Sequence, residues 1–399
     1  MNSRKTHSTL KDLDSMDGDS RARIKVVDRP TFILKTREGE SRAVSPSQRN
    51  GSNKCFHTRP VLSTRLEMTN AIKFMDENMQ LMENPLDYLY DQQDFVVVGC
   101  IGTRGVGKST ILSMLTSNYV ADVFATQTLS HHESGSNCTS GIDFYITKSR
   151  VIYLDTQPIL SGAAVDHAGL YEQKKNSNDF ANTENNVELQ SLQFTSFLLS
   201  VCHVIIFIQD WFVDPNLIRF IQTAEMLKPS SASAIDQDFV EYYPHILFLH
   251  NKAELQDFMP DTVDMMSDFY NKVLTNSRLQ THSGLNMGSS IVEGQLNLFI
   301  VPKITSEEDL VIHESEAKLI EKLRMRIHGV SRNPMTPAVL TEKNWWVTSI
   351  CVVMVGVKFC MMTLKILRIF FYSRYHYASK VIDAIKKSHL FSEYGRLMP

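Results

Sequence analysis

The sequence predicts a three-layer α/β protein, in which helices cover both faces of a central sheet. Between residues 95 and 301, short apolar runs of strand length alternate with longer segments of helical length, and this alternation is typical of such a fold. The 399 residues are 43% hydrophobic and 21% charged, so one large domain with irregular flanks is expected. We expect an arm at residues 1–64, a folded domain at 65–330 and a tail at 331–399.

The predicted arm is rich in Ser, Arg, Asp and Gly, and its one short apolar patch is at residues 32–34. Burial of so few apolar side chains cannot offset the entropy of ordering the chain, so the arm is expected to be disordered. It is also basic, because Lys and Arg outnumber Asp and Glu by 13 to 7 through Pro60. A solvated tail and a weak contact with RNA or an acidic partner are both compatible with this composition.

The whole chain has a formal net charge of −3 and a pI near 6.5. It therefore lacks the polycationic field that drives direct nucleic-acid binding, and any RNA association is expected to be indirect. The N-terminus has no apolar segment of the secretory type, and the six cysteines are scattered without CxxC pairs. We expect a reducing compartment, the cytoplasm, with a nuclear pool as the alternative.

The folded domain is expected to begin with two short helices. Ile72, Met75 and Met79 stand at helical spacing, and Leu86 and Leu89 indicate a second helix. The continuous apolar run at residues 95–101 predicts a strand buried on both faces.

The remaining elements follow in order. A helix is predicted at residues 108–116, and two close strands at 142–146 and 151–155 are expected to form a hairpin. The polar stretches at 161–184 and 229–238 are expected to be surface insertions. Three helix–strand pairs complete the pattern: 187–199 with 203–208, 215–227 with 245–249, and 261–276 with 297–301.

Residues 102–109 read Gly-Thr-Arg-Gly-Val-Gly-Lys-Ser, between the first core strand and the helix that follows it. This is the pattern of a P-loop, whose glycines let backbone N–H groups face phosphate oxygens while the helix adds its positive end. In that motif Lys108 would contact the terminal phosphates and Ser109 would bind Mg²⁺. The domain is therefore predicted to be P-loop and G-domain-like. Arg104 is either an arginine finger supplied in cis or a solvated loop residue.

Two further residues complete the predicted Mg²⁺ site. Asp155 ends a predicted strand, the position from which a carboxylate reaches Mg²⁺ through water. Thr139, followed by Ser-Gly-Ile, resembles the switch threonine of dynamin-like and guanylate-binding GTPases. An ordinary Ser/Thr loop is the alternative for Thr139. The predicted metal ligands are Ser109, Thr139 and Asp155.

Base recognition is predicted after the strand at residues 245–249. Asn251-Lys252-Ala253-Glu254 resembles the guanine-reading Asn-Lys-x-Asp, with Glu in place of Asp. This substitution leaves the identity of the purine nucleotide open between GTP or GDP and ATP. The predicted nucleotide-binding residues are Gly102, Arg104, Gly105, Val106, Gly107, Lys108, Ser109, Thr110, Asn251 and Lys252.

The residues after Asp155 depart from those of an active GTPase. Such enzymes typically read Asp-x-x-Gly, where the glycine N–H contacts the γ-phosphate, but this chain has Pro158, which has no N–H. Ile159 stands where Ras-like enzymes place the glutamine that orients water. Catalysis is therefore not expected, although Gln157 is a candidate substitute for the missing glutamine.

Several stretches resemble the SMG nine family of nonsense-mediated mRNA decay factors, and the resemblance runs from about Leu86 to the C-terminus. Asp155-Thr156-Gln157-Pro158-Ile159-Leu160 and Gln209-Asp210-Trp211-Phe212 carry it most specifically, because such sequences are unusual among G domains. Further matching stretches are Gly141-Ile142-Asp143-Phe144, Gln222-Thr223-Ala224-Glu225-Met226, Glu241-Tyr242-Tyr243-Pro244-His245 and Thr341-Glu342-Lys343-Asn344-Trp345.

The resemblance implies a nucleotide-binding regulatory subunit in nonsense-mediated mRNA decay. It implies a heterodimer with a related G-like subunit, SMG eight, that docks on the SMG-one kinase. This Ser/Thr kinase is related to phosphatidylinositol 3-kinases and phosphorylates an RNA helicase, UPF-one. A P-loop without the hydrolytic residues suits a nucleotide that holds a fold or an interface together. The alternatives are an active dynamin-like GTPase and a membrane-anchored P-loop NTPase.

The membrane alternative depends on residues 347–372, the most hydropathic stretch of the chain. Lys358, Lys365 and Arg368 interrupt this stretch, and charges within a span are costly. The family resemblance also breaks here, with Trp345 before the stretch and Tyr375 after it matching neighbouring positions of the family.

We therefore predict that residues 346–374 are translated intron sequence, with a natural apolar helix and a membrane anchor as alternatives. The codons of Trp345 and Trp346, TGG-TGG, contain a GT, and residues 370–374 can be encoded by a pyrimidine tract that ends in AG. Removal of the sequence between these sites keeps the frame and joins Trp345 to Tyr375. Beyond the stretch, apolar residues at helical spacing predict an amphipathic helix at 376–393, and the resemblance implies that it packs on the G domain.

Overall fold

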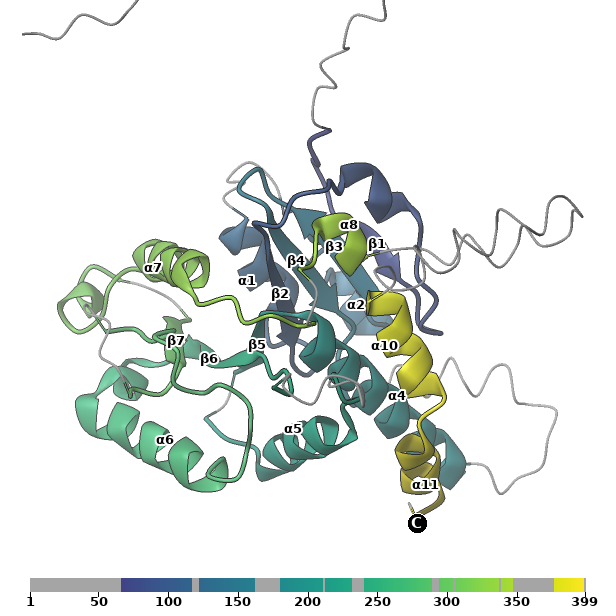
Figure 1. Ribbon diagram of the computed structural model, residues 1–399. Helices are drawn as coiled ribbons and strands as arrows, with labels where there is room; N and C mark the ends of the chain where they lie inside the picture. Colours follow the sequence, from purple (N-terminus) through teal and green to yellow (C-terminus); the bar gives the residue numbers. More distant parts are fainter. Residues whose placement is uncertain are drawn as a thin grey trace, which may run out of the picture. The chain divides into compact units, whose positions relative to one another are not determined.

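A seven-stranded mixed sheet lies at the centre of the protein (Figure 1). The computed structural model describes residues 66–116, 122–161, 180–210, 212–231, 240–288, 294–303, 306–336, 339–346 and 377–397. The strand order is β1-β3-β4-β2-β5-β6-β7, and the five strands from β4 to β7 run parallel. β3 runs antiparallel to both β4 and β1. The strands are β1 (Ile72–Met75), β2 (Val96–Ile101), β3 (Ile142–Ile146), β4 (Val151–Thr156), β5 (Val204–Gln209), β6 (His245–Ala253) and β7 (Leu298–Pro302).

Helices connect the parallel strands and extend into the tail. The α-helices are α1 (Lys108–Leu115), α2 (Leu129–Ser134), α4 (Phe180–Val201), α5 (Pro215–Leu227), α6 (Pro260–Val273), α7 (Glu316–Gly329), α8 (Glu342–Trp345), α10 (Tyr377–Lys386) and α11 (His389–Leu397). Short 3-10 helices are η1 (Asn84–Tyr88), η2 (Leu255–Phe258) and η3 (Asp309–Val311). The alternation of strands and helices predicted from residue 95 onward is confirmed.

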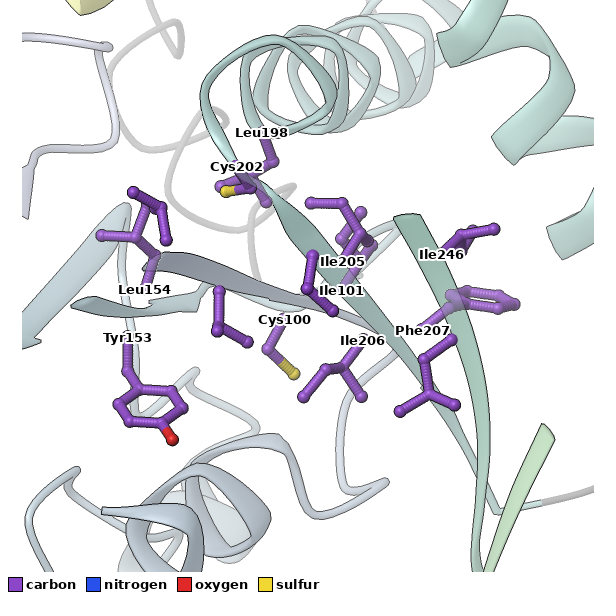
Figure 2. Packing of buried hydrophobic residues seen from close by; sticks show 14 of the residues in the cluster. Cys100, Ile101, Tyr153, Leu154, Leu198, Cys202, Ile205, Ile206, Phe207 and Ile246 are labelled. Atoms are coloured by element: carbon purple, nitrogen blue, oxygen red, sulfur yellow. The ribbon is translucent and has the colours of Figure 1, made fainter. Parts of the chain in front are cut away.

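The two faces of the sheet are covered by different helices (Figure 2). Cys202, just beyond α4, lies over one face, and a Cβ atom on Gly99 of β2 would lie only 2.8 Å from its sulfur. Tyr153 points from the opposite face towards α1, where its hydroxyl donates to the Leu115 carbonyl over 3.3 Å. The sheet is therefore sandwiched between helices, as predicted, and a glycine in β2 allows α4 to approach closely.

One early element differs from the prediction, because residues 72–75 form strand β1 rather than a helix. β1 pairs with β3, with Ile72 opposite Phe144, and this long-range pairing overrides the helical spacing of the apolar residues. Met79, assigned to the same helix, lies in a turn with a φ of 57°. The Asp76 carboxylate closes that turn by accepting hydrogen bonds from two backbone N–H groups.

The predicted surface insertion at residues 161–184 is too long. Residues 180–184 already belong to α4, which begins at Phe180, because amphipathic packing of the later turns propagates helix through a polar start. Residues 162–179, and most of the second predicted insertion at 229–238, lie outside the described residues.

The C-terminal tail returns to the domain through three helices. α8 and α10 contact each other, and both α10 and α11 pack against α4 (Figure 1). The amphipathic helix predicted at residues 376–393 is in fact two helices, because the chain leaves helical geometry between α10 and α11. This break lets both Ile385 of α10 and Phe391 of α11 be buried. The predicted arm at residues 1–64 lies outside the described residues.

Most of the predicted insertion at residues 346–374 also lies outside the described residues. Its first residue, Trp346, is fully buried with its ring centroid 4.7 Å from that of Phe74. The indole N–H of Trp346 has no hydrogen-bond partner among the described residues, an arrangement that costs stability. Among those residues, no helix is long and apolar enough to cross a membrane.

Deletion of residues 346–374 is expected to leave the folded domain intact. Tyr375 would then follow Trp345, and the short link to α10 spans up to about 11 Å, enough for helices that already touch. The deletion also removes the fully buried Trp346, so we expect a folded chain whose melting temperature is lower by up to about 10 °C. We expect a higher yield, because a long apolar stretch is removed. Circular dichroism melts of the two chains test this, and an unfolded deletion variant would contradict it. Sequencing the transcript across the Trp345 codon tests the intron itself.

His203 is expected to make a contribution to stability that is lost in mild acid. This ring is buried, and its Nδ1 accepts the Val97 N–H over 3.0 Å. Burial lowers the pKa of His203 from 6.5 to about 3, with a smaller contribution from His245. His203 therefore binds a proton near pH 6.5 in the unfolded chain but only near pH 3 in the folded chain. The contribution of neutral His203 to the free energy of unfolding is fully present above pH 6.5. It is lost as the pH falls towards 3, by about 2 kcal/mol at pH 5.

Urea unfolding at pH 7.5 and pH 5 checks this expectation. His203→Gln retains an oxygen acceptor for the Val97 N–H but does not titrate, so it should lose about 2 kcal/mol less than the wild type between these pH values. His389→Gln is the matched control, because His389 is exposed on α11. Equal acid losses in the wild type and His203→Gln would refute the assignment.

Candidate nucleotide site

The loop between β2 and α1 has the backbone geometry that its glycines were predicted to allow. Gly105 and Gly107 have φ values of 81° and 95°, in the left-handed region that favours glycine. A Cβ on Gly102 would lie 2.5 Å from the Ile208 carbonyl oxygen of β5. Gly107 is the N-cap of α1, so the predicted phosphate-binding loop ends at a helix N-terminus. Thr110 lies in the first turn of α1.

Lys108 begins α1 and folds back across this loop. Its side chain is buried, and Nζ donates to the Thr103 carbonyl over 2.9 Å. Burial lowers the pKa of Lys108, while the nearby Asp155 carboxylate acts in the opposite direction. The ammonium therefore lies over the loop, held by a backbone carbonyl of the loop itself.

Asp155 brings together the three residues predicted to bind Mg²⁺. At the end of β4, its Oδ2 accepts the Ser109 hydroxyl over 2.7 Å and the Thr139 hydroxyl over 3.0 Å. Its Oδ1 is buried and has no partner among the described residues. Burial raises the pKa of Asp155 to about 6, while Lys108 and the two hydroxyls oppose this shift. One carboxylate and two hydroxyls are hard oxygen ligands that fit Mg²⁺, and the unpartnered oxygen is an open acceptor.

The predicted base-reading residues also contact the loop. The Asn251 amide donates to the Val106 carbonyl over 2.8 Å, and Lys252 Nζ donates to the Gly105 carbonyl over 2.6 Å. Lys252 has a φ of 56° and lies 3.6 Å from a carboxylate oxygen of Asp210. The end of β6 is therefore hydrogen-bonded to the predicted P-loop.

Glu254, the residue that departs from the guanine-reading motif, is exposed at the start of η2. Its backbone N–H donates to Asp257 over 2.8 Å. This residue therefore begins a 3-10 helix immediately beyond the strand.

Gln157 and Ile159, which follow Asp155, both make contacts within the fold. The Gln157 side-chain oxygen accepts the Gly141 N–H over 2.8 Å, and its amide donates to Gln190 over 3.1 Å. Ile159 is buried, and its N–H donates to the Gly102 carbonyl over 3.2 Å. Both polar ends of the Gln157 side chain are thus hydrogen-bonded within the fold.

Comparison with known proteins connects this site to one family. The Smg8_Smg9 family model matches residues 90–243. The nonsense-mediated mRNA decay factor SMG9 of Xenopus laevis is 36% identical over 373 residues, covering 83% of this chain and 68% of that protein. The chain belongs to the SMG9 family. Protein SMG9 of Drosophila melanogaster is 27% identical over 289 residues, and the match covers 63% of this chain and 51% of that protein.

A solved structure, a bacterial selenocysteine-specific elongation factor EF-Sec, resembles this SMG9 family member only weakly. The TM-score is 0.29 at 11% identity, over 57% of this chain and 29% of that one. The matched region of the family model includes the P-loop, Thr139 and Asp155, and ends before Asn251.

In this SMG9 family chain, Arg104 contacts α2 and the segment just before it. Its guanidinium donates to the His131 carbonyl of α2 over 2.8 Å. With the Gln127 amide turned so that its oxygen faces Arg104, that oxygen accepts from Nε over 2.8 Å and from Nη2 over 3.1 Å. Sequence reasoning missed Gln127, His131 and the Asp210 contact with Lys252. No sequence spacing marks these contacts, because the His131 contact uses a backbone carbonyl, and the contacts of Gln127 and Asp210 depend on loop conformation.

Proposed function

We propose that this chain is a nucleotide-binding, G-domain-like regulatory subunit that acts in nonsense-mediated mRNA decay and does not hydrolyse its nucleotide. One observation carries the proposal. Ser109, Thr139 and Asp155 converge beside a glycine-lined loop, and a buried carboxylate oxygen there has no partner among the described residues. Buried polar atoms are almost always satisfied, and an unpartnered oxygen beside two hydroxyls and a helix N-terminus supports a bound group at this position.

The residues present suit a purine nucleotide with Mg²⁺. The loop N–H groups and the N-terminus of α1 would hold phosphate oxygens, and Lys108 would exchange its contact with the Thr103 carbonyl for the terminal phosphates. Ser109, Thr139 and Asp155 would hold Mg²⁺, which neutralises phosphate charge when bound. Asn251 and Lys252 would support the loop and the base. Exposed Glu254 leaves the choice between GTP or GDP and ATP to experiment.

The absence of hydrolysis is inferred from the residues that follow Asp155. Pro158 has no N–H for a γ-phosphate, and the side chain of Ile159 is in the core. The Gln157 side chain is engaged by Gly141 and Gln190. Rearrangement of these contacts would be needed before any of the three could assist water attack.

The wider role is inferred from the relatives, several of which are named nonsense-mediated mRNA decay factors. We infer that this chain pairs with an SMG eight-like G-like subunit. The pair would modulate an SMG-one-like Ser/Thr kinase that phosphorylates an RNA helicase. A tightly held nucleotide would stabilise the folded subunit that the partner recognises, because a ligand that binds only the folded state adds to its stability.

The test is the nucleotide content of the purified chain and the effect of Lys108→Ala. We expect mass spectrometry to detect a bound purine nucleotide, and we expect Lys108→Ala to reduce its retention. A ligand at about 100 times its Kd adds about 2.7 kcal/mol, so loss of retention should lower the melting temperature by several degrees. Lys387→Ala, at an exposed lysine in the tail, is the control.

Two results would overturn the proposal. The first is a wild-type chain that contains no purine nucleotide and cannot be loaded with one, alone or with its companion subunit. The second is phosphate release at a rate typical of assisted GTPases that is lost in Lys108→Ala, which would favour an active enzyme.

A further inference from the structure

Residues 122–141, which we call the strap, connect α1 to β3 and carry Thr139 near their end. The strap starts from a buried anchor, because Phe124 is fully buried and its N–H donates to the Ser113 hydroxyl over 3.0 Å. It ends at Thr139, which is also buried and bonded to Asp155. Both ends are therefore held by the folded domain.

The middle of the strap lacks such an anchor. α2 contains no buried residue, and Leu129 is 80% exposed. Without apolar burial, the position of this segment depends on a few polar contacts. Asn137 accepts the Ser161 hydroxyl over 2.8 Å, and the Cys138 thiol donates to two backbone carbonyls within the strap. Among the described residues, the hydrogen bonds between the strap and the P-loop come from Arg104.

Arg104 provides a fork of donors directed at the strap. Its guanidinium reaches the His131 carbonyl and, in the orientation that satisfies both groups, the Gln127 side-chain oxygen with two nitrogens. A planar guanidinium can serve these acceptors together, whereas a lysine ammonium is a point charge on a flexible stem. Because Arg104 lies between Gly102 and Gly105, its backbone belongs to the loop that would surround the phosphates.

We propose that Arg104 is a positioning residue that clamps the middle of the strap onto the P-loop and thereby slows the release of bound nucleotide. The inference rests on the proposed function for the identity of the ligand, while the clamp itself stands on contacts within the protein. It differs from the role of an arginine finger, which would act on the rate of phosphate cleavage.

The first measurement is nucleotide release from the full-length chain, using Mg²⁺ with fluorescent mant-labelled GTP and ATP. Arg104→Ala is expected to raise the dissociation rate by about ten- to a hundredfold, since charge-assisted hydrogen bonds to the strap are lost. Arg104→Lys should restore little of the slow release, because lysine keeps the positive charge but lacks the planar set of guanidinium donors. Gln127→Ala should produce a smaller rise. Arg332→Ala, at a surface arginine paired with Asp94, is the matched control and should release nucleotide as the wild type does.

The second measurement is amide hydrogen exchange of residues 126–134 with and without Arg104. Faster exchange there in Arg104→Ala, with unchanged exchange in β2 and α1, supports the clamp even in a preparation that carries no nucleotide. If the wild type fails to load either mant nucleotide, the proposed function fails while this measurement still decides the clamp. Unchanged strap exchange in Arg104→Ala, or full restoration of release by Arg104→Lys, would overturn the inference.

Discussion

Asp155→Asn is expected to change the stability of the empty chain and its nucleotide affinity in opposite directions. Without Mg²⁺ and nucleotide, the wild type buries a carboxylate whose Oδ1 has no partner among the described residues. Burial raises the pKa of Asp155 from 3.8 to about 6. As the pH rises from 4 to 6, the Asp155 carboxyl loses its proton in the unfolded chain before it does so in the folded chain. The free energy of unfolding therefore falls by about 3 kcal/mol, and this loss is complete above pH 6.

The uncharged asparagine avoids this loss, so at pH 7.5 the empty variant should melt about 5 °C higher than the empty wild type. Near pH 4 the difference should vanish, because the wild-type carboxyl is then protonated. Mg²⁺-dependent nucleotide affinity should instead fall by about a hundredfold, since a carboxylate near the metal is lost.

Thermal melts at both pH values, with chelator or with Mg²⁺ and nucleotide, separate these effects. Asp383→Asn, at an exposed aspartate of α10, is the control and should change neither. An empty Asp155→Asn variant that melts below the wild type at pH 7.5 would show that the carboxylate is satisfied within the fold.

Glu342→Ala is expected to be strongly destabilising, because it leaves a buried arginine without its partner. Glu342 is fully buried and accepts Arg150 Nε over 2.6 Å, while Arg150 Nη2 reaches its other oxygen. The Tyr90 N–H and the Gln92 amide add bonds of 2.9 and 2.8 Å. Breaking a buried ion pair by removing one partner costs about 3–5 kcal/mol, which corresponds to a fall in melting temperature of roughly 10 °C.

Denaturant unfolding of Glu342→Ala measures this loss. The control is Glu393→Ala, because Glu393 pairs with Arg396 at the surface of α11, where an ion pair contributes about 0–1 kcal/mol. The double variant Arg150→Leu with Glu342→Leu should recover part of the stability, since neither charge then stays buried alone. If Glu342→Ala lowers the free energy of unfolding by less than about 1 kcal/mol, water must solvate the Arg150 guanidinium in place of the lost carboxylate, and the expectation would be wrong.

These contacts also explain how the tail joins the domain. Trp345, three residues after Glu342, is fully buried, and its indole N–H donates to the Val201 carbonyl at the end of α4 over 2.9 Å. Glu342 and Trp345 come from one short stretch that matched the family by sequence. Its physical role was not predictable, because its partners Arg150 and Val201 lie far away along the chain.

The core strands were predictable because their patterns are local. A continuous apolar run such as residues 95–101 is hydrophobic on both faces, and that property alone indicates a buried parallel strand. β1 was not predictable in this way, since it is a short edge strand and only its pairing with β3 decides its conformation. The break between α10 and α11 likewise depends on the surface of α4 that the two helices cover.

The local sequence was enough to predict a phosphate-binding loop, since the glycines, Lys108 and Ser109 lie within eight residues and their chemistry follows from their spacing. It also determined that Pro158 offers no N–H, because that is a property of proline. Three features follow from the folded chain and not from local sequence: Ser109 and Thr139 meet at Asp155, Gln157 accepts the Gly141 N–H, and Arg104 contacts the strap. These contacts join segments far apart in the chain, and their geometry is set by how the strands stack and the loops close, which no local pattern of residues encodes.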